Sequence, residues 1–389
     1  MKAFDELYRC VHCGFCLPTC PTYLATGLEG KSPRGRLHLM KAVVEGRAEA
    51  KGKLLEYLDS CVYCLRCETA CPSGVRYGEV YEEFFKKYKK EMQSVSYRRV
   101  NLLFNLLNSK IGLRIAPYAK ILSQELGSMV SGGDISDLVG KVYEAKGDFR
   151  GRVALFVSGD CVAWRYRRSI VEAALRVLTW NGYKVVVPRF ACCGAPYRHS
   201  GQFEKAEALA QRNLSILKEL RGVDAVVVPN SGGCQAELLR YLRGLKVIDA
   251  AQLLADGLRG VLGEVKIKLA VQHSCHLMNV AKAHDVVLKI LSKIPGLVLA
   301  PLPSADVCCA GGNMYPLRHR KIADAVLAKK REEVLSLSPD GILAESPSCL
   351  QQLTKIGLPV YFPLEILDMS YARAENNGYP EIRARPLYG

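Results

Sequence analysis

The chain has 389 residues, 49% of them hydrophobic, which is enough for two or three domains with buried cores. Its formal net charge of +16 favours acidic or anionic partners, although a solvated basic surface would give the same value. Because no nucleic-acid-binding motif accompanies this charge, we expect no nucleic acid as a partner. No apolar run reaches the roughly 18 residues of a membrane-spanning helix, and the first residues lack the apolar core of a signal peptide, so we expect a cytoplasmic protein.

Two cysteine runs of identical spacing occupy the first 71 residues. Each reads C-x2-C-x2-C-x3-C-P, the spacing of two-cluster bacterial ferredoxins, in which the fourth cysteine of one run binds the other cluster. We therefore predict two [4Fe–4S] clusters with crossed ligation. The cluster 1 cysteines are Cys10, Cys13, Cys16 and Cys71, and the cluster 2 cysteines are Cys61, Cys64, Cys67 and Cys20. Zinc fits less well, since its four ligands usually come as two separated pairs.

The segment between the two runs is basic and then apolar. Pro33 and Gly35 indicate a turn, and the apolar positions after it suit a helix. Arg34 and Arg36 would offset the negative charge of a thiolate-bound cluster, unless they belong to an ordinary basic turn. A connection of this length with helical character predicts an α-helical ferredoxin domain, which we assign to residues 1–97.

A basic and amphipathic stretch follows the second run. Lysines and arginines between residues 82 and 100 precede apolar residues at helical spacing, which end before Pro117. Three interpretations stay open: a helix covering the chain's own core, a docking site for a partner subunit, or an interfacial helix on anionic lipid at the inner face of the cell membrane. We assign residues 98–148 to a helical connector, with a loop at Ser131-Gly132-Gly133-Asp134.

From about residue 150 strands and helices alternate, which predicts α/β domains with mostly parallel sheets. We expect two such domains, over residues 149–260 and 261–389. The expected strands are 153–157, 184–187 and 224–228, then 269–271, 297–299 and 341–343. Asn181-Gly182 is expected to end the first long helix.

The remaining cysteines form an internal repeat with an offset of 114 to 116 residues. The first copy has Cys161, Cys192, Cys193 and Cys234, and the second has Cys275, Cys308, Cys309 and Cys349. These cysteines lie at or near predicted strand ends, where α/β sheets place their sites. We predict a further metal-cluster site in one or both copies, with structural or redox-active thiols as the alternative.

Other polar side chains near these cysteines have two interpretations each. His199, His273 and His276 would replace a missing thiolate, as histidines do in Rieske centres, or form ordinary hydrogen bonds. The arginines just after Cys161 would raise a cluster's potential, bind an acidic partner, or simply begin a solvated helix. They are Arg165, Arg167 and Arg168.

Taken together, these motifs make the chain resemble the iron–sulfur subunit of glycolate oxidase over nearly its whole length. The resemblance rests on the two N-terminal runs, Ser32-Pro33-Arg34-Gly35-Arg36, Pro72-Ser73-Gly74-Val75-Arg76-Tyr77, Cys192-Cys193-Gly194, Ser231-Gly232-Gly233-Cys234, Cys275-His276-Leu277 and Cys308-Cys309. The cysteine-rich (CCG) segments are similar to those of lactate-utilisation, anaerobic glycerol-3-phosphate and heterodisulfide reductase subunits. The fold this implies is multidomain: the helical two-cluster ferredoxin domain, followed by two pseudo-repeated α/β CCG domains.

The resemblance implies an electron-transfer subunit of a flavin-dependent 2-hydroxy-acid dehydrogenase. FAD would lie on a partner subunit, since this chain has neither a GxGxxG fingerprint nor a P-loop. Electrons would then pass to a quinone or a soluble carrier. The alternative is a catalytic subunit that reduces a disulfide at its CCG clusters, as in heterodisulfide reductases. Ser231 and Ser346 stand where those reductases have a fifth cysteine in each copy, and Ala310 replaces a glycine.

Overall fold

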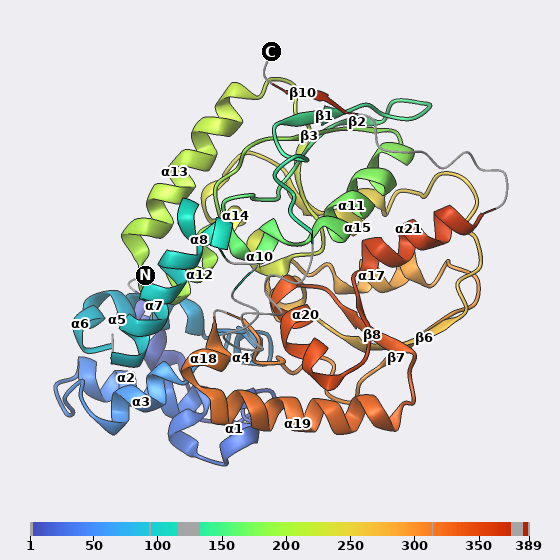
Figure 1. The fold of residues 1–389 in the computed structure, drawn as a ribbon. Helices are drawn as coiled ribbons and strands as arrows, with labels where there is room; N and C mark the ends of the chain where they lie inside the picture. Colours follow the sequence, from blue (N-terminus) through green and yellow to red (C-terminus); the bar gives the residue numbers. More distant parts are fainter. Residues whose placement is uncertain are drawn as a thin grey trace.

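The computed structural model describes residues 3–92, 95–115, 118, 133–312, 314–374 and 384–387. The N-terminal part is entirely helical and forms one lobe of the molecule (Figure 1). Its elements are η1 (Ala3–Arg9), α1 (Pro21–Thr26), η2 (Glu29–Lys31), α2 (Pro33–Val44), α3 (Lys53–Asp59), α4 (Arg66–Thr69), α5 (Tyr77–Lys87) and α6 (Lys89–Met92). A compact apolar core that includes Met40, Leu58, Val80 and Phe84 holds these short helices together.

Helix α2 begins earlier than the sequence suggested. The predicted turn at Pro33 and Gly35 is wrong, because both residues lie in the first helical turn. Ser32 caps the helix by accepting a hydrogen bond from the Gly35 N–H, and proline is well tolerated at this position. A Cβ on Gly35 would lie 2.0 Å from the Glu29 carbonyl oxygen, so close packing requires glycine here.

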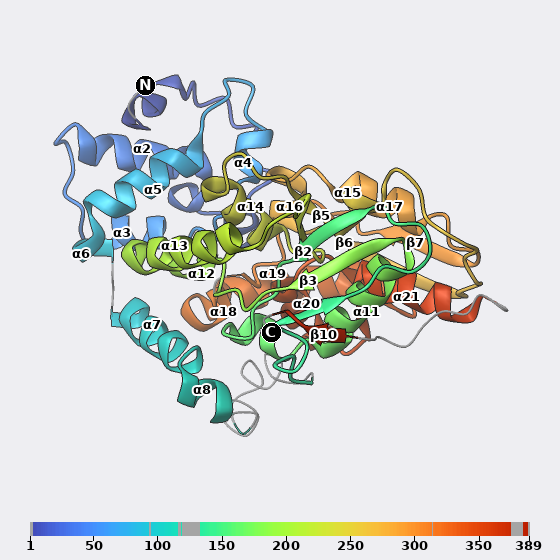
Figure 2. The ribbon, with the colours of Figure 1, turned by 90° about the horizontal axis from the view of Figure 1, so that it is seen from above.

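Helices α7 (Val95–Leu107) and α8 (Lys110–Ile115) leave the N-terminal lobe and run along the edge of the molecule (Figure 2). One face carries Phe104, Leu107 and Leu113, which are buried in the core of the first α/β domain. The interpretation as a helix covering the chain's own core therefore accounts for this face. The predicted break at Pro117 and the loop residues Ser131 and Gly132 lie outside the described residues.

The first α/β domain, called copy 1 below, is built on a six-stranded sheet in the order β10-β1-β3-β2-β4-β5. Its strands are β1 (Lys141–Tyr143), β2 (Gly151–Leu155), β3 (Tyr183–Val187), β4 (Ala225–Val228), β5 (Val247–Asp249) and β10 (Ala384–Pro386). Strands β3, β2, β4 and β5 are parallel, whereas β1 pairs antiparallel with both β3 and β10. Its helices are α10 (Val162–Arg165), α11 (Arg168–Trp180), α12 (Ala195–His199), α13 (Phe203–Glu219), α14 (Gly232–Tyr241) and α15 (Ala250–Leu254).

The second α/β domain, copy 2, has a four-stranded parallel sheet in the order β7-β6-β8-β9. Its strands are β6 (Ile267–Gln272), β7 (Leu297–Pro301), β8 (Gly341–Ala344) and β9 (Val360–Tyr361). Its helices are α16 (Cys275–Asn279), α17 (His284–Leu291), α18 (Tyr315–Arg318), α19 (Arg320–Ser336), α20 (Pro347–Leu353), η4 (Thr354–Ile356) and α21 (Pro363–Arg373). The order matches that of β3-β2-β4-β5, so the cysteine repeat reflects a repeated fold.

The two copies share one apolar core, in which Leu155 and Val177 of copy 1 cluster with Leu343 and Leu367 of copy 2. All six predicted strands are present, and the α/β architecture after a helical N-terminus is confirmed. The stretch expected to be a helical connector is helical at α7 and α8, but its residues 141–143 form strand β1. Strand β10, from the far C-terminal end, completes the sheet of copy 1.

Candidate functional site

All sixteen cysteines are free thiols, and those of the N-terminal lobe line two neighbouring cavities. The first cavity is lined by Cys10, Cys13, Cys16, Cys67 and Cys71. The second is lined by Cys20, Cys61, Cys64 and Cys67. Each fourth cysteine thus lies with the other run, and Cys67 borders both cavities. The fold brings these thiols together in the grouping that crossed ligation requires.

The donor set fits a cluster of several irons better than one ion. Within the described ranges, no three His, Cys, Asp or Glu side chains converge on a point as ligands of a single metal ion do. The thiols instead surround hollows, and a cubane needs this wider spacing because each thiolate binds a different iron. A [4Fe–4S] cluster held there would accept and release one electron at a time.

Hydrogen-bond donors point at one sulfur of each cavity, Cys61 of the second and Cys71 of the first. The Tyr63 N–H and the Tyr77 hydroxyl lie 3.4 and 3.5 Å from the Cys61 sulfur, and the Val75 N–H lies 3.5 Å from that of Cys71. Bonds of this kind stabilise negative charge on sulfur and help to set a cluster's potential.

Arg36 is a fully buried cation beside the second cavity. It donates hydrogen bonds to the Tyr57 carbonyl oxygen at 2.9 Å and to the hydroxyls of Thr22 and Ser60 at 2.9 and 3.0 Å. Its guanidinium lies 4.0 Å from the Cys20 sulfur. Burial alone would lower the pKa of Arg36, but the negative charges available on neighbouring groups, led by the Cys61 thiolate, raise it.

Arg34 has a different role from Arg36. It lines the first cavity, but it pairs with Glu29 at 2.8 Å and donates to the His12 carbonyl oxygen at 2.9 Å. Its charge is therefore largely balanced by a carboxylate at the surface. Although Arg34 and Arg36 are close in the sequence, they lie at different cavities. Of these two arginines, Arg36 is the buried cation beside a cysteine-lined cavity.

All eight cysteines of copies 1 and 2 line a single cavity of about 100 Å³, called the thiol cavity below. The sequence predicted one site for each copy, and the fold makes the two sets face each other. The segments that follow β2, β3 and β4 bring one set, and the equivalent segments after β6, β7 and β8 bring the other; Cys234, Cys275 and Cys349 lie in the first turns of α14, α16 and α20. Carboxyl ends of parallel strands meet at one edge of a sheet, which is why residues far apart in sequence converge here.

Within the thiol cavity hydrogen bonds between cysteines lower the pKa of Cys192 and Cys234 in copy 1 and of Cys309 in copy 2. In copy 1, hydrogen bonds from Cys161 and Cys193 lower the pKa of Cys192 well below its ordinary value. In copy 2, hydrogen bonds with Cys308 and Cys349 lower the pKa of Cys309 in the same way. A thiolate-forming, sulfur-only donor set is suited to iron–sulfur chemistry.

The N-terminal lobe meets the thiol cavity at Val62, which lines it, and Cys64 lies next to this point. Cys64 is hydrogen-bonded to Cys308, and the Asn279 side chain donates to the Cys64 carbonyl oxygen at 2.9 Å. Arg66 pairs with Asp306 at 2.6 Å, close to the same contact. The contact between Cys64 and Cys308 could not be predicted from the sequence. The two cysteines belong to different motifs, and the spacing within a motif does not show how the domains pack together.

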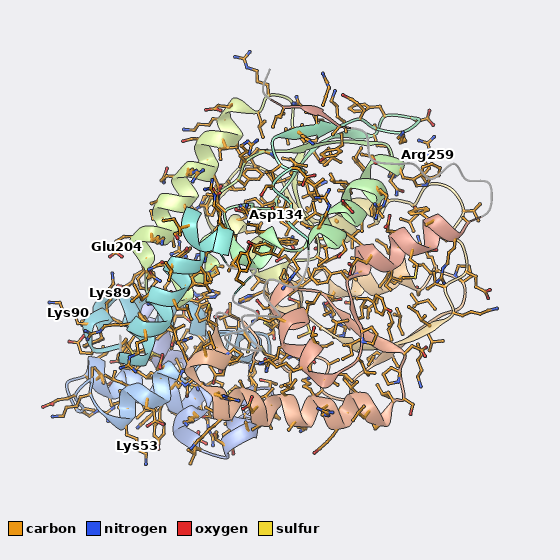
Figure 3. The ribbon with its side chains drawn as sticks, in the orientation of Figure 1. Lys53, Lys89, Lys90, Asp134, Glu204 and Arg259 are labelled. Atoms are coloured by element: carbon orange, nitrogen blue, oxygen red, sulfur yellow. The ribbon has the colours of Figure 1, made fainter. Side chains whose placement is uncertain are left out.

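Copy 1 contacts the N-terminal lobe through aromatic packing and ion pairs. Phe203 packs against the core of the lobe beside Phe85, and the His199 ring centroid lies 4.7 Å from that of Tyr63. Glu82 pairs with Arg198 at 3.1 Å and with Arg240 at 2.6 Å. At the surface, Lys89 faces Glu204 at 2.7 Å (Figure 3). Both copies are therefore fixed to the lobe, and the contact of copy 2 includes sulfur.

Two of the three predicted histidines lie at the thiol cavity. His199 and His276 line it, with ring centroids 5.6 Å apart, and burial lowers the pKa of His276 to about 4. His273 instead lines a separate cavity with His284. Ser231 and Ser346, the positions of the absent fifth cysteines, also border the thiol cavity.

The arginines after Cys161 bind the chain's own groups. Arg165 pairs with Asp134 at 2.9 Å, and Arg168 pairs with Asp137 and Glu172, both at 2.6 Å. Arg167 is buried, and burial lowers its pKa to about 10. The pairs formed by Arg165 and Arg168 fix the start of the first long helix.

Comparison with known proteins agrees with these sites. Residues 6–75 match the 4Fe-4S dicluster domain family, and residues 153–238 and 269–354 each match the cysteine-rich domain family, CCG. The chain is 31% identical to the probable glycolate oxidase iron–sulfur subunit of Bacillus subtilis, over 91% of this chain and 89% of that protein. It belongs to the glycolate oxidase iron–sulfur subunit family.

Other relatives of this iron–sulfur subunit cover most of its length. The glycolate oxidase iron–sulfur subunit of Escherichia coli is 27% identical, over 92% of each chain. One subunit of the dihydromethanophenazine:CoB–CoM heterodisulfide reductase of Methanosarcina mazei is 25% identical, over 90% of this chain and 88% of that one. The protein is thus an iron–sulfur electron-transfer subunit of an oxidoreductase. No helix in the described part of the chain is long and apolar enough to cross a bilayer.

Proposed function

We propose that this subunit accepts electrons from an FAD-containing 2-hydroxy-acid dehydrogenase subunit and passes them singly to a quinone or a soluble carrier. The observation that carries this is the unbroken series of thiol sites. Cys13 is exposed at the first cavity, Cys67 borders both N-terminal cavities, and Cys64 contacts Cys308 at the thiol cavity. Such a series fits a relay that splits a two-electron oxidation into single-electron steps.

In this relay the cluster 1 cysteines would hold one [4Fe–4S] cubane and the cluster 2 cysteines the other. Arg36 would stabilise the reduced, more negative form of the second cubane. The cysteines of copies 1 and 2 would hold one or two additional clusters at the thiol cavity. The partner's flavin would oxidise the hydroxy acid, because a relay built from thiol sites alone supplies no hydride acceptor.

The first test is the metal content of the anaerobically purified chain, combined with low-temperature EPR. About eight irons per chain would correspond to two cubanes, and a clear excess would mean that the thiol cavity is loaded. Cys13→Ser should remove one cubane signal, whereas Cys349→Ser should leave both N-terminal signals intact. Stoichiometric zinc, or loss of the same signal in both variants, would contradict the ligand assignment.

The second test concerns the electron donor. The complex should be purified from native cells, and glycolate or lactate should then reduce the cubanes within one turnover of the flavin. The heterodisulfide reductase relative keeps a second function open, reduction of a disulfide at the thiol cavity. Turnover of a disulfide by the isolated subunit with a chemical reductant would favour that function, and failure of the hydroxy acids to reduce the cubanes would exclude the first.

A further inference from the structure

The outer face of α7 and α8 carries large apolar side chains that the fold leaves uncovered. Leu102 is 71% exposed, Leu106 is 52% exposed and Ile111 is 71% exposed, and Tyr118 just beyond α8 is 75% exposed. Leu102 and Leu106 lie one helical turn apart and therefore share a face. Large exposed apolar side chains that gather on consecutive helices indicate an interaction site. These four residues are called the outer stripe below.

In the sequence, the charges that flank the outer stripe have a single sign. Residues 92–124 contain no aspartate or glutamate, and they include five basic residues. These are Arg98, Arg99, Lys110, Arg114 and Lys120. Arg98 lies one turn before Leu102 on the same face of α7, and Arg114 lies one turn after Ile111. Arg98, Arg99 and Arg114 are all exposed.

We propose that the outer stripe binds the surface of an anionic phospholipid bilayer. Exposed apolar side chains that are flanked in the sequence by basic residues match an interface with acyl chains below and negative headgroups above. Each arginine near such a surface contributes about 1 kcal/mol of attraction. A protein interface of standard type would instead be expected to mix charges of both signs at its rim, and the stripe has no acidic residue of its own.

The opposite face of the same helices is tied to the cysteines of copy 1. The Asn108 side-chain oxygen accepts a hydrogen bond from the Val162 N–H at 2.8 Å, directly after Cys161. Asn101 and Asn105 donate to Ser200 and Gln202 of copy 1 at 3.2 and 3.0 Å. A bilayer bound at the outer stripe would therefore lie next to copy 1, where a lipid-soluble electron acceptor could approach. Only this last step rests on the proposed function; lipid binding itself does not.

Co-sedimentation of the full-length, cluster-containing protein with vesicles tests the proposal. Vesicles of phosphatidylcholine with 30% phosphatidylglycerol should bind the protein at least tenfold more tightly than vesicles of phosphatidylcholine alone, and added salt should weaken the binding. The combined variant Leu102→Gln, Leu106→Gln and Ile111→Gln should lose about tenfold or more of this affinity. These side chains are exposed, so the fold and the cluster spectra should not change.

A matched control replaces exposed apolar residues elsewhere. Val261 is 73% exposed and Val298 is 51% exposed, and Val261→Gln with Val298→Gln should bind vesicles like the wild type. Equal binding with and without phosphatidylglycerol would overturn the proposal. So would a stripe variant that binds vesicles normally but no longer co-purifies with a flavoprotein, since that would identify a protein partner. Reduction of the cubanes by the flavoprotein needs no vesicles, so its failure is a separate result.

Discussion

Copies 1 and 2 have the same strand order and the same four cysteines, yet they meet the N-terminal lobe in different ways. Copy 2 contacts the lobe through buried groups: Cys64 against Cys308, and the Tyr315 hydroxyl donating to the Ser60 carbonyl oxygen at 2.8 Å. Copy 1 contacts the lobe through the Glu82 ion pairs and through Phe203, which packs beside Phe85. The repeated fold thus has two equivalent thiol sets, and the set of copy 2 adjoins the second N-terminal cavity through Cys64.

The interiors of the two copies differ in charge as well. Asn213 and Lys330 are each the eleventh residue of a 17-residue helix, α13 and α19, and both are buried. Asn213 donates to the Cys192 carbonyl oxygen at 3.2 Å, whereas the Lys330 ammonium donates to the Ser304 hydroxyl at 2.7 Å. Burial lowers the pKa of Lys330, and the Glu333 carboxylate and the nearby thiolates oppose that shift. Copy 2 therefore holds a buried cation near its cysteines where copy 1 holds a neutral amide.

The largest expected difference concerns the attachment of the two copies. Asp59 pairs with Arg318 at 3.0 Å and with His319 at 3.1 Å, and all three side chains are largely buried. Asp59→Asn removes the anion from this buried pair, so the free energy of unfolding should fall by about 3–5 kcal/mol. Anaerobic urea denaturation of the cluster-containing protein measures this change.

Glu82→Gln is the matched variant at the copy 1 contact. Arg198 keeps its second partner, Glu237, at 2.7 Å, and Arg240 is half-exposed, so the loss should be only about 1–2 kcal/mol. An equal or larger loss for Glu82→Gln would mean that copy 1 is held as firmly as copy 2, and the contrast between the contacts would fail.

The boundary between the two copies should respond to pH through Asp249. This buried carboxyl of copy 1 accepts hydrogen bonds from the Ala251 N–H and the Asn230 side chain, both at 2.9 Å. Burial raises its pKa to about 7, and the charge of Glu345 in copy 2 adds to that shift. The folded protein thus holds a proton that the unfolded chain releases near pH 4, so stability should fall as the pH rises from about 4 to 7 and level off above 7.

Between pH 5 and pH 7 this group should account for a loss of roughly 2–3 kcal/mol in the free energy of unfolding. Asp249→Asn cannot ionise, so its unfolding free energy should vary less with pH over the same range. Parallel pH profiles for the two proteins would show that Asp249 is already ionised at the boundary, contrary to this prediction.

The sequence predicted the features that depend on local pattern. Short apolar runs such as 184–187 identified the parallel strands, and the repeated cysteine spacing indicated which thiols of the N-terminal lobe lie together. Both signals are strong because buried strands and cluster loops constrain consecutive residues. The family followed from the same motifs and is confirmed by the relatives.

The features missed by the sequence depend on contacts between distant segments. The Cys64–Cys308 junction and the shared thiol cavity arise from domain packing, which no spacing rule encodes. Strands β1 and β10 are three residues long and pair at a sheet edge, too short for an apolar period to identify. The start of α2 at Pro33 was missed because Pro and Gly were interpreted as turn residues, whereas Ser32 makes them the beginning of a helix.

A smaller effect would sharpen the link between copy 2 and the second cubane. If that cubane binds beside Arg36, replacing the buried cation should lower its midpoint potential, because the reduced cluster carries more negative charge. Arg36→Met should shift one cubane by about 1–2 kcal/mol, or roughly 50–100 mV for one electron, and leave the other nearly unchanged. EPR-monitored redox titration measures both potentials in the same sample.

Arg36→Lys keeps the positive charge but changes the packing. The midpoint potential of the second cubane in this variant should therefore be close to that of the wild type. Arg34→Met is the control at the first cavity, where Glu29 already balances the charge. If Arg36→Met shifted the midpoint potentials of both cubanes equally, Arg36 would not act specifically on the cubane next to copy 2.

The smallest effect compares the backbone after the paired cysteines of each copy. Gly194 of copy 1 has φ 100° and ψ −17°, outside the left-handed region that other residues tolerate, and a Cβ there would lie 3.2 Å from the Ala206 carbonyl oxygen. Ala310 of copy 2 has φ 55°, which alanine adopts at a cost of about 1 kcal/mol. Gly194→Ala should therefore destabilise the protein by about 1 kcal/mol or somewhat more.

Ala310→Gly relieves strain but adds freedom to the unfolded chain, so its net effect on the urea midpoint should be close to zero. If Ala310→Gly destabilised the protein as much as Gly194→Ala, this prediction would be wrong. The two copies would then differ in their buried charges and in their contacts with the N-terminal lobe, but not in the backbone conformation that these two positions require.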